Sequence, residues 1–194
     1  MKTQQSYSQN SPTIESLRLQ LRPHSPVELL ALIEGTEQFY CASGLRAADG
    51  LRDFFFSGEA SDSWLVQLRA STTADPWVFG FAVVDRKSGL VIGSAGFKGA
   101  PDGEGMVEIA YGIVPAFEGK GYATEAARAL IAFVLNDSRV RVIRAHTLPT
   151  PNASTRVLTK NGFAKVGEIV DPEDGLVWRW ERTRSPSSRA QQEP

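Results

Sequence analysis

The sequence predicts a mixed α/β domain built on a mostly antiparallel sheet of about six to seven strands with one parallel pair. Three alternating segments follow one another within residues 77–114, separated by Gly-rich turns, which is typical of an antiparallel meander. The third is followed by a long amphipathic segment and another apolar strand. A unit of strand, helix and strand makes its two strands parallel neighbours, joined by a right-handed crossover.

Residues 14–182 are expected to form a single domain, because a chain of 194 residues is long enough for one well-buried core and too short for two. The segment 1–13 is polar, and the segment 183–194 is rich in Ser, Arg, Gln and Pro. Neither end offers enough apolar surface to offset the entropy of ordering it. We therefore expect both ends to be disordered.

Composition and charge exclude several classes of function. The net charge of -1 provides no long-range attraction to nucleic acid or to acidic membranes. Cys41 is the only cysteine, so an internal disulfide is impossible and a reducing compartment is favoured. The longest purely apolar run, Ala129–Leu135, is far too short to span a bilayer. We expect a cytoplasmic protein with no nucleic-acid or membrane partner.

The domain is predicted to open with a strand and a helix. Leu17–Leu21 alternates strictly, and Ser25 followed by Pro26 is typical of a helix N-cap with proline at the first helical position. Between Ile33 and Arg69, many aromatic and aliphatic residues are separated by glycines, which predicts two or three helices. Most of these apolar side chains must be core, because exposing so many would be costly.

The middle of the chain changes to a period of two. Strands are predicted at Trp77–Val84, Leu90–Phe97 and Met106–Val114. The first two are joined by a hairpin turn at residues 85–89, and the third follows a Gly-rich loop at residues 98–105.

The last part is predicted to contain two helices and three strands. A helix over Tyr122–Leu135 leads to a strand at Val140–Leu148. Asn152 is a good N-cap for the next helix, which Gly162 ends after Lys160. Strands at residues 164–170 and 176–181 flank a turn, and Trp178 and Trp180 share a face of the second one.

The junction between the third meander strand and the long helix is predicted to bind an anion. Gly119 and Gly121 let the backbone turn sharply, and a helix N-terminus follows with its free N–H groups and positive dipole end. Lys120 adds a positive charge. The spacing does not match an NTPase phosphate loop, since Gly121 follows Lys120, nor a dinucleotide fingerprint, since Thr124 occupies its third glycine position. Among ligands, a phosphorylated cofactor fits best; a Gly-rich turn that starts a helix without any ligand is the alternative that these residues alone leave open.

The same junction resembles the cofactor motif of the GNAT superfamily of acyl-CoA-dependent N-acyltransferases, Gln/Arg-x-x-Gly-x-Gly/Ala. It reads Glu118-Gly119-Lys120-Gly121-Tyr122-Ala123, with Glu118 in place of Gln or Arg. The segments Asn152-Ala153-Ser154 and Lys160-Asn161-Gly162-Phe163 are similar to the superfamily's branch of ribosomal-protein N-terminal acetyltransferases. The resemblance covers most of residues 17–181.

The resemblance implies a GNAT-like twisted sheet with helices on both faces, and acetyl-CoA as co-substrate without a metal. The acceptor would be a primary amine, either a protein N-terminus or a small molecule, acetylated directly in a ternary complex by a monomer or homodimer. Residues 35–76 would build its pocket. The residues implied to bind the cofactor are Ile113, Val114, Glu118, Gly119, Lys120, Gly121, Tyr122, Ala123, Thr124 and Asn152.

Acetyl transfer needs a base for the amine proton and an acid for the departing thiolate. Glu108 is the lone charge on a strand face otherwise made of small and apolar residues, and by itself it reads as a strand-end glutamate that reaches solvent or pairs with an arginine. The resemblance implies that it is the base, that a backbone N–H near Val114 stabilises the oxyanion, and that Ser154 hydrogen-bonds the leaving sulfur. His146 and His24 read as structural residues.

A second class of function stays open, in which the protein is a non-catalytic CoA-binding regulatory module of the same fold. The presence of both Glu108 and Ser154 favours the enzyme, because a pure binder needs neither.

Overall fold

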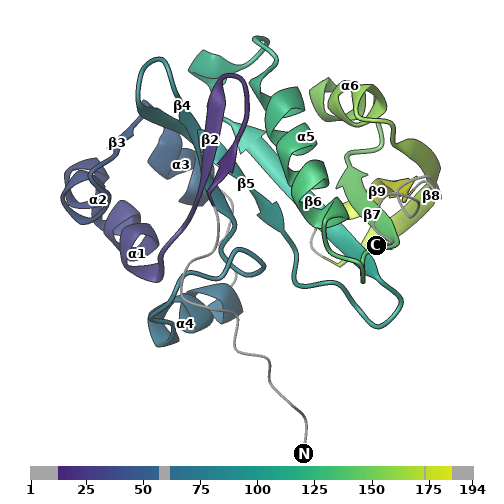
Figure 1. Cartoon of the computed structure of the whole chain (residues 1–194), viewed down its shortest axis with the longest axis horizontal. Coiled ribbons are helices and arrows are strands. Elements are labelled where there is room, and N and C mark those ends of the chain that lie inside the picture. Colours follow the sequence, from purple (N-terminus) through teal and green to yellow (C-terminus); the bar gives the residue numbers. More distant parts are fainter. Residues whose placement is uncertain (1–12, 57–61, 173, 185–194) are drawn as a thin grey trace, which may run out of the picture.

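The computed structural model describes residues 13–56, 62–172 and 174–184. In these residues the strands form one sheet in the order β1-β2-β4-β5-β6-β7-β9-β8, and β3 lies alongside β5 (Figure 1). The strands are β1 Ile14–Glu15, β2 Leu19–Pro23, β3 Arg46–Ala47, β4 Phe81–Asp85, β5 Leu90–Phe97, β6 Met106–Ile113, β7 Val142–Thr147, β8 Ala164–Asp171 and β9 Gly175–Thr183.

The predicted fold class is confirmed. Of the described strands, β1 and β3 have two residues each and the longer ones match the predicted six to seven. The meander is β4, β5 and β6, paired antiparallel in sequence order. The predicted parallel pair is β6 with β7, and the short β3 adds a second parallel pairing to β5.

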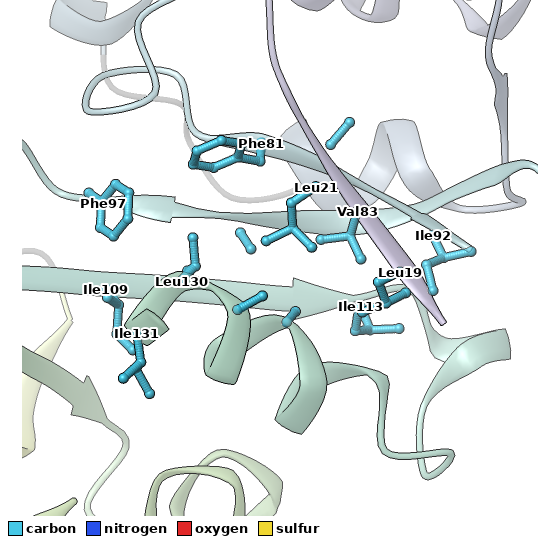
Figure 2. Packing of buried hydrophobic residues seen from close by; sticks show 14 of the residues in the cluster. Leu19, Leu21, Phe81, Val83, Ile92, Phe97, Ile109, Ile113, Leu130 and Ile131 are labelled. Atoms are coloured by element: carbon cyan, nitrogen blue, oxygen red, sulfur yellow. The ribbon is translucent and has the colours of Figure 1, made fainter. Parts of the chain in front are cut away.

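Helices cover both faces of the sheet. They are α1 Pro26–Glu34, α2 Thr36–Ser43, α3 Leu51–Phe56, α4 Asp62–Ala70, α5 Tyr122–Leu135 and α6 Ala153–Lys160. Successive side chains of β6 point to opposite faces of the sheet and contact different helices. Ile109 lies near Leu130 and Ile131 of α5 (Figure 2), whereas a Cβ on Gly112 would meet the ring of Phe54 from α3 at 2.3 Å.

The main core lies between the sheet and α5. Figure 2 shows apolar side chains from β2, β4, β5, β6 and α5 packed together there. A smaller cluster under α1 and α4 contains Leu29, Leu68 and Phe79. The N-cap predicted for α1 at Ser25 is present, and the structure adds a capping box: Ser25 accepts from the N–H of Glu28, and the Glu28 carboxylate accepts from the N–H of Ser25.

Several predicted boundaries need correction; for example, the strand predicted at Val140–Leu148 spans Val142–Thr147. The strand predicted from Trp77 begins only at Phe81, because Asp75 folds the preceding residues into a turn, accepting from the N–H of Trp77 through its carboxylate and from Val78 through its carbonyl. Leu17 is 89% exposed, so β2 begins at Leu19.

At the other end, β9 continues to Thr183, and the N–H of Arg184 donates to the carbonyl of Arg141. Thr183 therefore belongs to the sheet, and Arg184 is hydrogen-bonded next to it. The rest of the two ends predicted to be disordered, residues 1–12 and 185–194, lies outside the described residues.

The sheet opens at its centre. The parallel pairing of β6 with β7 covers only Met106 to Glu108 opposite Val142 to Arg144. Beyond that register β6 stays paired with β5, and β7 stays paired with β9. The two parallel strands therefore separate toward their carboxyl ends, where the loop before α5 and the start of α6 follow.

Candidate active site

A cavity of about 890 Å³ lies at this opening, lined by residues of α3, β6, α5 and α6 and by the loop before α5. We call it the larger cavity. Most of the residues predicted to bind a cofactor or to act in catalysis line it: Ile113, Glu118, Gly119, Gly121, Tyr122, Ala123, Thr124 and Ser154.

The loop before α5 has the geometry that its two glycines predicted. Pro115–Phe117 forms one 3-10 turn, after which Gly119 (φ 70°) and Gly121 (φ 82°) adopt the left-handed conformation. Gly121 is the N-cap of α5, and no side chain caps this helix end. The N–H groups of the first turn have no partner within a helix, so they remain available to an anion.

Arg18, just before β2, connects this loop to the N-terminal part of the chain through hydrogen bonds and a cation–π contact. Its Nε donates to Oε2 of Glu125 (2.7 Å), its Nη1 donates to the carbonyl of Lys120 (2.9 Å), and its guanidinium lies over the ring of Tyr122 (4.5 Å). Burial alone would raise the pKa of Glu125, but hydrogen bonds from Arg18 and Ser16 outweigh it and hold that pKa below its ordinary value. The loop is thus supported by a charged contact behind it.

Three of the predicted cofactor residues are not among those that line the larger cavity. The ammonium of Lys120 donates to the carbonyl of Ala116 (2.8 Å), and the side chain of Asn152 caps α6 by accepting from the N–H of Thr155 (2.9 Å). The N–H of Val114 donates to the carbonyl of Ile92 (2.9 Å). That N–H is therefore occupied by the sheet and is not free for a ligand.

Sequence reasoning missed two cations in the wall of the larger cavity. Arg156 and Lys160 lie on α6, on the face that also presents Ala153 and Val157. Residues spaced by three and four positions share one face of a helix. Arg156 and Lys160 follow the predicted cap at Asn152 at intervals of four residues, and this spacing could have predicted that they share a face of the helix.

A second cavity of about 410 Å³, the smaller cavity, adjoins the first. Tyr111 and Ser154 line both cavities. The smaller one contains ionisable side chains from separate parts of the chain, namely Lys98, Glu108, His146 and Asp174.

Glu108 and His146 meet where β6 and β7 begin to separate. Oε1 of Glu108 lies 3.0 Å from Nδ1 of His146 and 3.2 Å from Nζ of Lys98. The arginine opposite Glu108 in the parallel register, Arg144, instead binds Glu181 through Nε (3.0 Å) and Nη2 (2.8 Å). The expected alternative, an arginine partner for Glu108, is thus replaced by a histidine and a lysine.

From the sequence alone, His146 has no functional partner. In the structure, its side chain contacts Glu108. The signal lay in topology, because Glu108 and His146 both fall on the polar positions of two strands predicted to be parallel neighbours. Burial alone would lower the pKa of the Lys98 ammonium, but the charge and hydrogen bond of Glu108, with Asp171 and Asp174, raise it overall.

Tyr111 stands between the two cavities. Its hydroxyl donates weakly to the carbonyl of Ser154 (3.4 Å), and burial raises its pKa, so it remains a neutral phenol. No group of three His, Cys, Asp or Glu residues that could hold a metal occurs among residues 13–56, 62–172 and 174–184. In the same residues, no helix combines the length and apolar character needed to cross a bilayer.

Comparison with known proteins decides the family. Residues 18–164 match the family model described as acetyltransferase (GNAT) domain. The chain belongs to this GNAT family. A curated relative, the uncharacterized N-acetyltransferase YjdG of Bacillus subtilis (strain 168), is 32% identical over 111 residues, which cover 57% of this chain and 64% of that protein. The chain thus matches less than two thirds of that relative's length.

Solved structures share the GNAT fold at low sequence identity. The ribosomal-protein-S5-alanine acetyltransferase of Vibrio fischeri has a TM-score of 0.62 at 15% identity and covers 91% of this chain and 98% of its own. AAC(6')-Ib, solved with ribostamycin and coenzyme A, has a TM-score of 0.59 at 22% identity and covers 92% of this chain and 100% of its own. Likeness at this level concerns the fold alone.

Proposed function

We propose that this GNAT protein is an acetyl-CoA-dependent N-acetyltransferase that transfers an acetyl group directly to a primary amine in a ternary complex. The observation that carries the proposal is the contact between the two cavities at Tyr111 and Ser154. A cofactor in one and an amine in the other would meet at this shared wall. Holding both reactants in place makes the reaction effectively unimolecular.

The larger cavity would hold acetyl-CoA. Its pyrophosphate would lie against the left-handed turns at Gly119 and Gly121 and the first turn of α5, where N–H donors and the helix dipole favour anions. Arg156 and Lys160 line the same cavity and would add positive charge from α6. Membership in the GNAT family supports the same co-substrate.

Glu108 would be the general base of the smaller cavity. Its carboxylate would take one proton from the acceptor ammonium, and the freed lone pair would form the C–N bond at the thioester carbonyl carbon. The C–S bond then breaks, and the second amine proton goes to the departing thiolate, which leaves as CoA thiol. Glu108 returns its proton to solvent, so protons and electrons balance over one turnover.

Ser154 would serve the leaving group. It lies in the first turn of α6, with Asn152 as the cap, and it lines both cavities. A hydroxyl at the shared wall can hydrogen-bond the sulfur as negative charge develops there. The neutral phenol of Tyr111 occupies the same wall, where its hydroxyl donates to the carbonyl of Ser154 beside the proposed donor.

The acceptor is proposed as a primary amine, either a protein N-terminus or a small molecule. The fold does not choose between these, since the neighbours described above include a ribosomal-protein alanine acetyltransferase and a protein solved with ribostamycin. A cytoplasmic location and a monomeric or homodimeric state stay predictions from the sequence.

The test is to incubate the protein with acetyl-CoA and a panel of amines and N-terminal peptides, and to follow release of free thiol. We expect thiol release that depends on one class of amine. Tight binding of acetyl-CoA without amine-dependent turnover would contradict the proposal and support the alternative of a non-catalytic CoA-binding regulatory module.

A further inference from the structure

Glu108 is held through one of its two carboxylate oxygens. Both its contacts, from Nδ1 of His146 and from Nζ of Lys98, go to Oε1. Among the described residues, no hydrogen bond joins a side chain to Oε2 of Glu108, and the side chain, 15% exposed, lines the smaller cavity. One oxygen is held by two contacts, and the other is left for a ligand of that cavity.

The contact with Glu108 also fixes the tautomer of His146. A carboxylate only accepts hydrogen bonds, so Nδ1 of His146 carries the proton that binds it. The other ring nitrogen, Nε2, is buried and has no partner among the described residues. The imidazole of His146 therefore donates its Nδ1–H to Glu108 and makes no other hydrogen bond within the described part of the chain.

We propose that His146 is a positioning residue that, together with Lys98, orients the Glu108 carboxylate so that Oε2 faces the nitrogen of the acceptor amine. The proposal rests on the function proposed above for the same site. In each cycle the proton leaves the acceptor ammonium for Oε2 and passes from there to solvent. His146 keeps its Nδ1 proton throughout, and no bond to the imidazole forms or breaks.

The two donors reach the carboxylate from different strands. Lys98 directly follows β5, and His146 lies on β7, so the carboxylate on β6 is held from either side of the point where the sheet opens. The side chains of Glu108 and His146 are only 15% and 12% exposed, whereas that of Lys98 is 53% exposed. The buried histidine is thus the better-fixed donor. Misplacing a reacting group by about 1 Å can lower a rate about 10²-fold.

The first test compares His146→Leu with His146→Asn. The Asn amide can present an N–H close to the position of Nδ1, and leucine cannot. We expect His146→Leu to lower kcat by about 10- to 100-fold with the KM for acetyl-CoA within about twofold, and His146→Asn to retain kcat within about threefold. Equal losses in both variants, or a raised acetyl-CoA KM at unchanged kcat, would overturn the proposal.

The second test places His146→Leu in a Glu108→Gln background. A residue that acts through Glu108 has no further effect on kcat once that carboxylate is gone. Additive losses would mean that His146 acts independently of Glu108. The matched control is His24→Leu at the other histidine, which lines neither cavity and should leave the kcat of the folded protein unchanged.

A third measurement needs no turnover. Nitrogen NMR of the ¹⁵N-labelled protein reports which ring nitrogen is protonated, and the chain has only two histidines, so His146→Asn and His24→Leu assign the signals. We expect His146 as the Nδ1–H tautomer. An Nε2–H tautomer would overturn the positioning role even in an active enzyme. Absence of turnover together with an Nδ1–H tautomer would instead contradict the proposed function alone.

Discussion

The two cavities that adjoin at Tyr111 and Ser154 are built differently. In the larger one, the proposed phosphate site is formed mainly by main chain, through the turns at Gly119 and Gly121 and the first turn of α5. The smaller one depends on side chains that converge from separate strands, with Glu108 at the centre. Main-chain donors tolerate most substitutions except an added Cβ, whereas a site made of side chains can be abolished by one. Variants can test this contrast, beginning with the largest expected effect.

Glu108→Gln should break only the smaller site. The change keeps the shape of the side chain and removes the base, so kcat should fall by about 10² to 10⁴. Affinity for acetyl-CoA should stay unchanged, because Glu108 does not line the larger cavity. Steady-state kinetics with calorimetry of acetyl-CoA binding measures both. Turnover within twofold of wild type would return Glu108 to a structural role.

Gly121→Asp should break only the larger site. It places a Cβ and a negative charge in the proposed phosphate turn, and we expect affinity for CoA to fall at least about tenfold, or about 1.4 kcal/mol. Gly89→Asp is the matched control, because Gly89 has a similar φ of 71°, open space around its Cβ position and a place in the β4–β5 hairpin.

Both glycine variants carry a similar left-handed strain, about 1–2 kcal/mol, and they differ in that a Cβ at position 121 would lie 3.4 Å from Nη2 of Arg18. Equal CoA affinities by calorimetry would remove the cofactor assignment.

Two lysines near the larger cavity sharpen the contrast further. Lys160 lines that cavity, whereas the ammonium of Lys120 is bonded to the carbonyl of Ala116. Lys160→Ala should weaken CoA binding several-fold and more strongly at low salt, since the contact is between charges. Lys120→Ala should change the affinity by less than about twofold, because main chain carries most of the binding at the loop. The reverse order would give Lys120 the phosphate role predicted from the sequence.

Substitution of His24 is expected to have the smallest effect on activity. It should change the pH dependence of the folding stability instead. Burial, with the charge of Arg22, lowers the pKa of His24 to about 3. In the unfolded chain His24 binds a proton below about pH 6.5, whereas in the folded protein it stays neutral down to about pH 3. The free energy of unfolding should therefore fall as the pH drops from about 6.5 toward 3, by up to about 1.4 kcal/mol per pH unit.

Urea unfolding of wild type and His24→Leu between pH 7 and pH 5 measures this contribution. The stability difference between the two proteins should change with pH over that interval. Parallel curves would contradict the buried neutral histidine.

The sequence predicted the main-chain features better than the side-chain cluster. The limits of α5, Tyr122 and Leu135, and of β5, Leu90 and Phe97, were predicted as observed, because glycines and turns bound strongly periodic segments. The partner of Glu108 was missed, because which residue of β7 reaches it depends on where β6 and β7 separate. Local periodicity contains no information about that point.

The contacts of Arg18 with α5 and the loop before it have a consequence for how the protein folds. Arg18 and Glu125 are separated by 107 residues, so their ion pair forms only when the first and the central parts of the chain have come together. Contacts this distant in sequence are slow to form, because the entropy of closing the intervening loop is lost first. We therefore expect α5 to form early and the loop before it to become rigid late. Binding of a CoA analogue during refolding should therefore lag behind the recovery of helical circular dichroism, and Arg18→Ala should lose that late gain in affinity.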